Sequence, residues 1–249
     1  MITVRGIELT KANVAKMIDF SILHPDTVKA NIVEGIELCK KYRFNSFCVN
    51  PNFLPMVVEG LKGEPCVPSV VLDFPFGSGS EAIKLAAAEE MTKAGAKALD
   101  MVIDVGALKD KNYKLVTQEI KNLVKAGGGI KTKIIIEVAY LTRDEIVAAC
   151  KCVEDGGASY VKSSTGRAPH GPSMSEVKLM RDSVSKNVGV KVAGTGSFWT
   201  PEIAFGCILA GADIIGTRSG PQIIDEIPLI EEIFYGKNVS VAAAVGVGK

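Results

Sequence analysis

Short apolar runs alternate along the chain with longer stretches in which apolar residues recur at helical spacing. The short runs are rich in Val and Ile, as strands buried on both faces are. This alternation is typical of βα units built on a parallel sheet. The pattern predicts eight strands, at Met17–Leu23, Ser46–Asn50, Ser69–Phe74, Ala98–Val105, Lys133–Ala139, Tyr160–Ser164, Val188–Ala193 and Asp213–Gly216.

The segments between these strands have the pattern of helices. They are Asp26–Lys41, Asn52–Leu61, Ser80–Ala94, Asn112–Ala126, Thr142–Asp155, Ser173–Ser185, Thr200–Ala210 and Pro221–Ile233. Eight strands alternating with eight helices predict an α/β fold, a single-domain (β/α)8 TIM barrel over residues 1–236. The tail over residues 237–249 shows no helical or strand period, and we expect it to be loosely ordered.

Several element boundaries have their own sequence signals. Ser80 and Thr142 precede helical runs as capping residues, the latter as a capping box with Glu145, and Pro201 fits a first helical turn. Glycines follow three predicted helices, where a left-handed residue often ends a helix. These glycines are Gly95, Gly157 and Gly211.

Composition narrows the class of protein. The 249 residues are 47% hydrophobic and 23% charged, as in a globular chain that buries a core. The formal net charge is +1, so no overall field favours nucleic acid or a membrane surface as a partner. The first residues hold Arg5, Glu8 and Lys11 among the apolar ones, unlike a signal peptide, and no apolar run is long enough to span a bilayer. We expect a soluble, cytoplasmic protein.

Cysteine and histidine spacing gives no sign of a metal site. The six cysteines form no C-x-x-C pair, and the two histidines have no Cys or His at ligand spacing. We expect the cysteines to be buried thiols and no metal to be bound.

Charged residues interrupt several predicted strands near their carboxyl ends, where barrels bind ligands. They are Asp100, Asp104, Glu137, Lys162 and Lys191. Any one of them alone is explained by a side chain that reaches solvent at a strand end. Their coincidence favours a functional site.

Lys162 and Lys191 fall at like positions of the sixth and seventh strands, which places their amines in one barrel mouth. Like charge and apolar walls both disfavour protonated amines, so at least one lysine should have a lowered pKa and attack carbonyls. Asp100, on the fourth strand, can supply a carboxylate for proton transfer. This constellation predicts Schiff-base chemistry.

The loops after the last three strands are rich in glycine and hydroxyl residues. Exposed amides at a helix start, together with arginine, are suited to a phosphate group, and barrels often place that site after strands seven and eight. Tight turns alone would explain the glycines equally well. The candidate phosphate-binding residues are Gly166, Arg167, Gly194, Thr195, Gly196, Ser197, Gly216, Arg218 and Ser219.

Over nearly its whole length the chain resembles the class I deoxyribose-phosphate aldolases, the DeoC-like family. The segments that carry this resemblance are Phe47–Pro51, Asp73–Gly77, Leu99–Leu108, Tyr160–Gly166 and Ile214–Gly220. The resemblance implies a (β/α)8 barrel, no metal or organic cofactor, and a homodimer or higher homo-oligomer. It also implies that Lys162 forms the Schiff base, that Lys191 lowers its pKa, and that Asp100 acts with a water in proton transfer.

The sequence departs from that family at the phosphate end. Family members usually follow the seventh-strand lysine with Ala-Ser-Gly-Gly-Ile/Val-Arg-Thr, whereas the segment after Lys191 is longer and lacks that arginine. Arg218 is placed to restore the charge. Phe198 and Trp199 either add bulk at the mouth or form a packing pair, and Asp73 offers a second carboxylate nearby.

We expect a class I aldolase that acts on a small phosphorylated sugar, and the best single candidate is 2-deoxy-D-ribose 5-phosphate, cleaved to acetaldehyde and glyceraldehyde 3-phosphate. A relative that uses the same lysine on a different acyl, keto or sugar substrate is the first alternative. The second is a non-catalytic barrel that binds a phosphorylated metabolite or assembles with a partner, because one fold hosts many functions.

Overall fold

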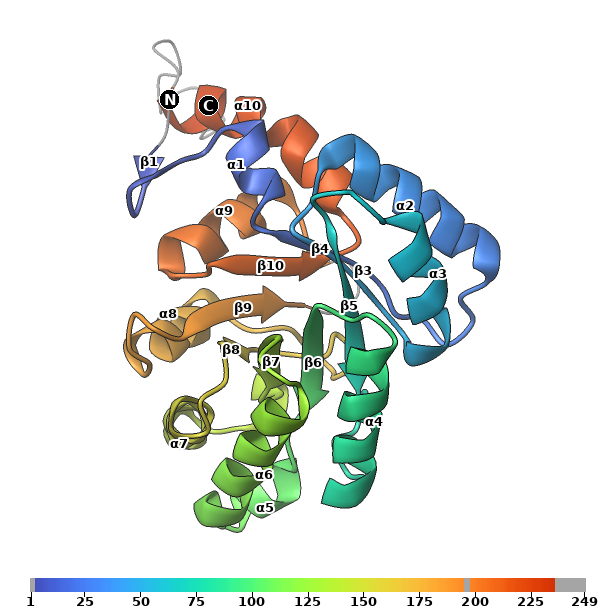
Figure 1. Cartoon of the computed structure of the whole chain (residues 1–249). Helices are drawn as coiled ribbons and strands as arrows, with labels where there is room; N and C mark the ends of the chain where they lie inside the picture. Colours follow the sequence, from blue (N-terminus) through green and yellow to red (C-terminus); the bar gives the residue numbers. More distant parts are fainter. Residues whose placement is uncertain (1–2, 195–197, 236–249) are drawn as a thin grey trace.

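Eight parallel strands close into a barrel surrounded by helices, which confirms the predicted (β/α)8 fold (Figure 1). The structure is a computed structural model that describes residues 3–194 and 198–235. Around the barrel the strand order is β10-β3-β4-β5-β6-β7-β8-β9. The strands are β3 (Ile18–Ile22), β4 (Ser46–Val49), β5 (Val67–Leu72), β6 (Ala98–Val102), β7 (Lys131–Ile135), β8 (Tyr160–Lys162), β9 (Gly189–Ala193) and β10 (Ile214–Thr217).

The predicted helices are all present, with shifted ends. They are α2 (Lys29–Tyr42), α3 (Leu54–Gly60), α4 (Glu81–Lys93), α6 (Tyr113–Ala126), α7 (Arg143–Asp155), α8 (Met174–Asp182), α9 (Pro201–Ala210) and α10 (Gly220–Tyr235). The tail predicted over residues 237–249 lies outside the described residues.

Six short elements did not follow from the sequence pattern, because none is long enough to show a period. They are β1 (Thr3–Val4), β2 (Ile7–Glu8), α1 (Lys11–Ala15), η1 (Pro51–Phe53), α5 (Val105–Lys109) and η2 (Val138–Tyr140). In Figure 1, α1 lies beside α10, and the two helices are in contact.

Two predicted strands extended furthest beyond their observed ends. The fourth barrel strand, β6, ends at Val102 instead of Val105 because Asp104 caps α5, accepting a hydrogen bond of 2.9 Å from Ala107 N. Asp104 is therefore a helix cap and not a strand residue. The next strand, β7, ends at Ile135 instead of Ala139 because the backbone turns at Glu137.

Helix ends follow the predicted chemistry with one exception. Thr142 and Glu145 form the predicted capping box, and Pro201 opens α9 after the capping Thr200. Ser80 occupies the predicted cap position of α4, but its side chain makes no cap hydrogen bond. The three predicted helix-ending glycines all have positive φ: Gly95, Gly157 and Gly211.

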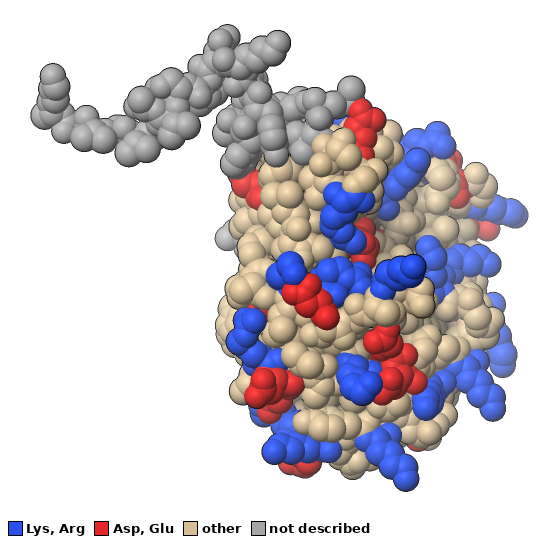
Figure 2. Space-filling model, turned by 90° about the vertical axis from the view of Figure 1, so that its left-hand side faces the viewer, with Lys and Arg blue, Asp and Glu red and all other residues tan. Residues whose placement is uncertain are grey.

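The apolar core lies between the outer face of the barrel and the helices. Phe47 of β4 packs against Gly35 of α2, and Ile18 of β3 packs against Gly220 at the start of α10. Side chains alternate along a strand, so the residues between these apolar ones face the barrel interior. On the face shown in Figure 2, Lys and Arg are interspersed with Asp and Glu, as the net charge near zero leads one to expect.

Candidate active site

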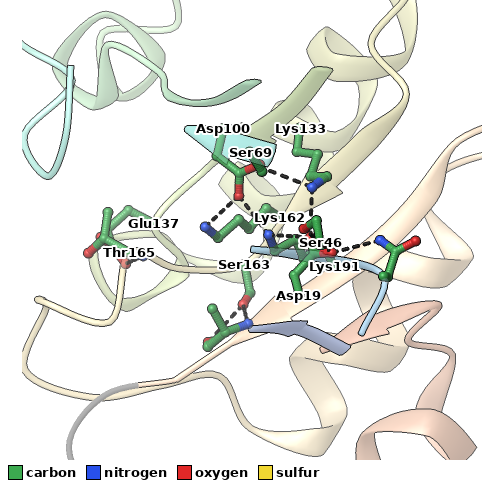
Figure 3. Close-up of polar contacts among 12 residues, drawn as sticks. Asp19, Ser46, Ser69, Asp100, Lys133, Glu137, Lys162, Ser163, Thr165 and Lys191 are labelled. Carbon is green, nitrogen blue, oxygen red and sulfur yellow. Dashed lines mark hydrogen bonds and ion pairs between the residues drawn. The ribbon is translucent and has the colours of Figure 1, made fainter. Parts of the chain in front are cut away.

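The barrel interior holds a buried network of three lysines and two aspartates (Figure 3). Asp100 Oδ2 lies 2.8 Å from Lys162 Nζ and 2.7 Å from Lys191 Nζ. Lys191 Nζ also lies 2.6 Å from Asp19 Oδ2, which in turn is 2.7 Å from Lys133 Nζ. All five side chains are at most 3% exposed, so no bulk water screens them.

Strand register brings the three predicted catalytic residues together. Lys162 of β8 pairs directly with Lys191 of β9, as their like positions in the sequence predicted. Asp100 reaches them from β6 across the barrel, and all three side chains point into the interior (Figure 3). The structure therefore brings these three side chains together, and their catalytic roles stay a prediction.

Two members of the network, Asp19 and Lys133, were not among the predicted site residues. Asp19 is a lone carboxylate within the apolar run of β3, and Lys133 lies within β7. Asp19 also accepts hydrogen bonds from Ser46 Oγ at 2.6 Å and Asn45 Nδ2 at 2.7 Å. The signal was a charge inside an otherwise apolar strand, the same signal that identified Asp100.

The network gives its members different pKa shifts. Burial lowers the pKa of Lys162; Asp100 opposes this, and the charge of Lys191 lowers it further. Burial also disfavours a charged Lys191, but Asp100 and Asp19 raise its pKa above the ordinary value. Although burial by itself raises the pKa of Asp100, the lysines hold it well below its usual range. The pKa of Lys162 is thus shifted toward the neutral amine, whereas that of Lys191 is shifted toward the charged one.

A cavity of about 280 Å³ opens above the network at the carboxyl ends of the strands. Lys162 and Lys191 both line it, so both side chains border the space that a small ligand would occupy. Predicted phosphate-binding residues line the same cavity: Gly166, Arg167, Gly194, Gly216, Arg218 and Ser219. The predicted Thr195, Gly196 and Ser197 lie outside the described residues.

Two arginines give the cavity rim positive charge. Arg167 and Arg218 are both exposed and line the cavity. Burial lowers the pKa of Arg167, and the neighbouring charge of Arg218 lowers it further, so the two guanidinium groups lie near one another. Two like charges at one rim favour an anionic ligand.

The structure shows where the residues that depart from the family pattern lie. Trp199 lines the cavity and packs against Phe198, with ring centroids 4.9 Å apart in a T-shaped arrangement. Bulk at the mouth and an aromatic pair are therefore both present. Asp73 is not among the cavity-lining residues: its carboxylate accepts from Gly79 N at 2.8 Å and lies 3.5 Å from Lys84 Nζ. It therefore anchors its own loop rather than adding a carboxylate to the cavity.

The cysteines, the arrangement of metal-ligating side chains and the character of the helices were also predicted from the sequence. All six cysteines are free and buried, as predicted, and Cys48 lines the cavity. Within residues 3–194 and 198–235, no group of three His, Cys, Asp or Glu residues is arranged to hold a metal ion. Over the same residues, no helix has the length and apolar character that crossing a membrane requires.

Comparison with known proteins identifies the family. The family model described as DeoC/LacD family aldolase matches residues 13–198, a span that includes Lys162, Lys191 and Asp100. The chain belongs to the DeoC/LacD family of aldolases. The predicted resemblance is thereby confirmed, and with it the expectation of an aldolase, a lyase.

Individual members of this family match most of the chain. A deoxyribose-phosphate aldolase from Macrococcus caseolyticus is 41% identical over 85% of this chain and 96% of its own length. The solved structure of the aldolase QR15 is 31% identical, covers 89% of this chain and 98% of its own, and has a TM-score of 0.81. The tetrameric deoxyribose phosphate aldolase of Aeropyrum pernix shares the fold, with a TM-score of 0.81 and 23% identity over 89% of this chain and 93% of its own.

Proposed function

We propose that the protein is a class I aldolase that reversibly cleaves 2-deoxy-D-ribose 5-phosphate to glyceraldehyde 3-phosphate and acetaldehyde. Curated relatives at about 40% identity are named deoxyribose-phosphate aldolases. The family description names no substrate, and the residues that line the cavity support a phosphorylated one.

The observation that carries the proposal is the charge balance of the buried network. Three lysines surround two carboxylates, so all five groups cannot be charged without an excess positive charge in the barrel interior. Lys191 bonds both carboxylates, whereas Lys162 bonds Asp100 alone. A neutral Lys162 amine balances the network, and a neutral amine is the nucleophile that a Schiff base needs.

The chemistry begins with attack of the Lys162 amine on the aldehyde carbon of the open-chain sugar. The carbinolamine loses water to give a protonated imine. A base removes the proton of the hydroxyl on the third carbon, the bond between the second and third carbons breaks, and its electron pair moves toward the iminium nitrogen as an enamine. Glyceraldehyde 3-phosphate leaves; protonation of the enamine carbon and hydrolysis release acetaldehyde and restore Lys162.

Asp100 is placed for the proton transfers of this sequence. Its Oδ2 contacts both Lys162 Nζ and Lys191 Nζ, so it can exchange a proton near the reacting carbon directly or through one water. Lys191, whose pKa is raised by Asp100 and Asp19 against the effect of burial, keeps its proton and thereby disfavours a second charge on Lys162.

The rim of the cavity supports a phosphorylated substrate. Arg167 and Arg218 can neutralise a dianion, and the amides of the Gly216–Ser219 turn precede α10, where the helix dipole favours negative charge. These groups and Lys162 line the same cavity of about 280 Å³. A different acyl, keto or sugar substrate is the alternative, because the loop after β9 departs from the family pattern.

We further propose that the protein acts in the cytoplasm as a homodimer or higher homo-oligomer. The six buried free thiols suit a reducing compartment. The Aeropyrum pernix protein that shares this fold is described as tetrameric.

The test of the proposed function is a comparison of kcat/KM for deoxyribose 5-phosphate and for deoxyribose with the purified protein. We expect acetaldehyde release from both and a clear preference for the phosphorylated sugar. Cleavage without such a preference would contradict the phosphate assignment and leave the lysine chemistry in place. No cleavage of either sugar, with cleavage of another aldol, would support the alternative substrate.

A further inference from the structure

A buried carboxylate beside the catalytic network has no part in the chemistry proposed above. Glu137 follows β7 and is 3% exposed. In Figure 3 it lies with Thr165 to the left of Lys162, whereas Asp19, Lys133 and Lys191 lie to the right. A carboxylate is rarely buried unless its oxygens are hydrogen-bonded, so its partners indicate its role.

Both carboxylate oxygens of Glu137 are hydrogen-bonded to Thr165. The backbone N of Thr165 donates to Oε1 at 3.3 Å and to Oε2 at 3.2 Å, and its hydroxyl donates to Oε2 at 2.5 Å. The adjacent backbone is joined as well, since Val138 N donates to Ser163 O at 2.9 Å. These hydrogen bonds join the end of β7 to the loop that follows β8, the strand that carries Lys162.

The backbone of Glu137 is in a conformation that glutamate seldom adopts. Its φ is 54° and its ψ is 67°, in the left-handed region where a side chain beyond glycine is strained. Strain of this kind persists where the surroundings hold it, and it concentrates at functional sites. This conformation aims the carboxylate at Thr165 instead of continuing the strand.

The contact continues from Thr165 to Arg167. The single hydroxyl proton of Thr165 is committed to Glu137, so its oxygen uses a lone pair to accept from Arg167 N at 2.9 Å. Gly166 between them has a φ of 81°, and a Cβ there would lie 2.7 Å from Gly194 O. Thr165, Gly166 and Arg167 all line the catalytic cavity.

We infer that Glu137 is a positioning residue that holds the Thr165–Arg167 turn in the shape that binds the phosphate end of the substrate. The inference rests on the proposed function, because it assigns the ligand of that turn. Glu137 touches neither the substrate nor the reacting atoms: it acts through Thr165, and its removal changes recognition of the phosphate more than the bond-breaking step.

The test is Glu137→Gln, which keeps the side chain's size but turns an NH2 group toward the two donors of Thr165. We expect KM for deoxyribose 5-phosphate to rise about 10-fold, the effect of one weakened charge-assisted hydrogen bond. KM for deoxyribose should change by less than about 2-fold, and kcat should change less than KM. Glu59→Gln, which removes an exposed carboxylate on α3, is the matched control and should match the parent.

A second pair of variants addresses the same contact if Glu137→Gln is poorly folded. Thr165→Val removes the hydroxyl at nearly constant size, and Thr165→Ser keeps it. The valine variant should lose the preference for phosphate, and the serine variant should retain most of it. In the double variant of Glu137→Gln with Thr165→Val, the losses should be less than additive, because both changes act on the same hydrogen bond between the Thr165 hydroxyl and Glu137.

The kinetics of the parent and of the Glu137→Gln variant distinguish a failure of this inference from a failure of the proposed function. A parent that does not distinguish the two sugars overturns both the phosphate assignment and the inference. If the parent prefers the phosphorylated sugar, the inference alone is overturned by either of two results. Glu137→Gln keeps the full preference, or it loses activity on both sugars equally.

Discussion

Lys162 and Lys191 share one oxygen atom of one carboxylate. Asp100 Oδ2 lies 2.8 Å from the first amine and 2.7 Å from the second. Because both amines contact the same oxygen, a positive charge on one lysine disfavours protonation of the other. In the proposed mechanism, this coupling favours a neutral Lys162 beside a charged Lys191.

The coupling predicts the effect of Lys191→Met on the pH dependence of the reaction. Without the neighbouring charge of Lys191, the pKa of Lys162 should rise, so less of this amine is neutral at pH 7. We expect kcat/KM at neutral pH to fall roughly 10- to 100-fold, the result of one to two pKa units, with partial recovery as the pH rises. Lys178→Met, which removes an exposed lysine of α8, is the control. A reduced rate with an unchanged profile would contradict the coupling.

Asp100→Asn is expected to separate attack from proton transfer. Asp100 raises the pKa of Lys162, so its removal should leave the amine neutral and able to form an imine. Turnover should fall about 10²- to 10⁴-fold, the usual contribution of a positioned acid or base. Borohydride trapping on Lys162 should persist. Loss of trapping in a folded variant would instead assign Asp100 to imine formation.

The same variant should be less stable, because it leaves three lysines around one carboxylate. Breaking a buried ion pair by removing one partner costs about 3–5 kcal/mol. Thermal unfolding therefore accompanies the kinetic measurement and shows whether the variant is folded at the assay temperature. Asp182→Asn, at an exposed ion pair, should leave both stability and turnover nearly unchanged.

Arg218→Ser tests the anion site on the side of the cavity formed after β10. Arg218 is exposed, so its hydrogen bond to a phosphate is partly screened, and we expect a loss in kcat/KM of about 10-fold for deoxyribose 5-phosphate. The value for deoxyribose should stay within about 2-fold. Arg143→Ser removes an exposed arginine at the start of α7 and serves as the control. Equal losses for both sugars would remove Arg218 from phosphate recognition.

The sequence predicted the fold well because its strands are buried on both faces. Apolar runs such as Ser46–Asn50 differ from the helices in length and spacing, so their order was visible without a structure. Strand ends were less visible. Ile136 and Val138 continue the apolar pattern of β7, and only the left-handed backbone of Glu137 ends the strand. Local composition does not encode that turn.

Strand pairing explains why the sequence placed Lys162 and Lys191 together but did not predict Asp19 and Lys133. Lys162 and Lys191 occupy neighbouring strands in sequence, so their proximity followed from the order of elements. Asp19 reaches Lys191 because β10 pairs with β3 and closes the barrel, which brings the first strand beside the last. Lys133 enters the network through Asp19. A single sequence gives the order of strands, but not which inward side chains meet across the interior.

The central claim is that Lys162 forms the covalent intermediate, and borohydride trapping tests it most directly. Incubation with acetaldehyde and borohydride should add one ethyl group to the protein, seen by intact mass. Peptide mapping should place it on Lys162, and Lys162→Ala should show neither adduct nor cleavage, since no other amine can form the same intermediate there. An adduct on Lys191, or substantial turnover by folded Lys162→Ala, would contradict the account.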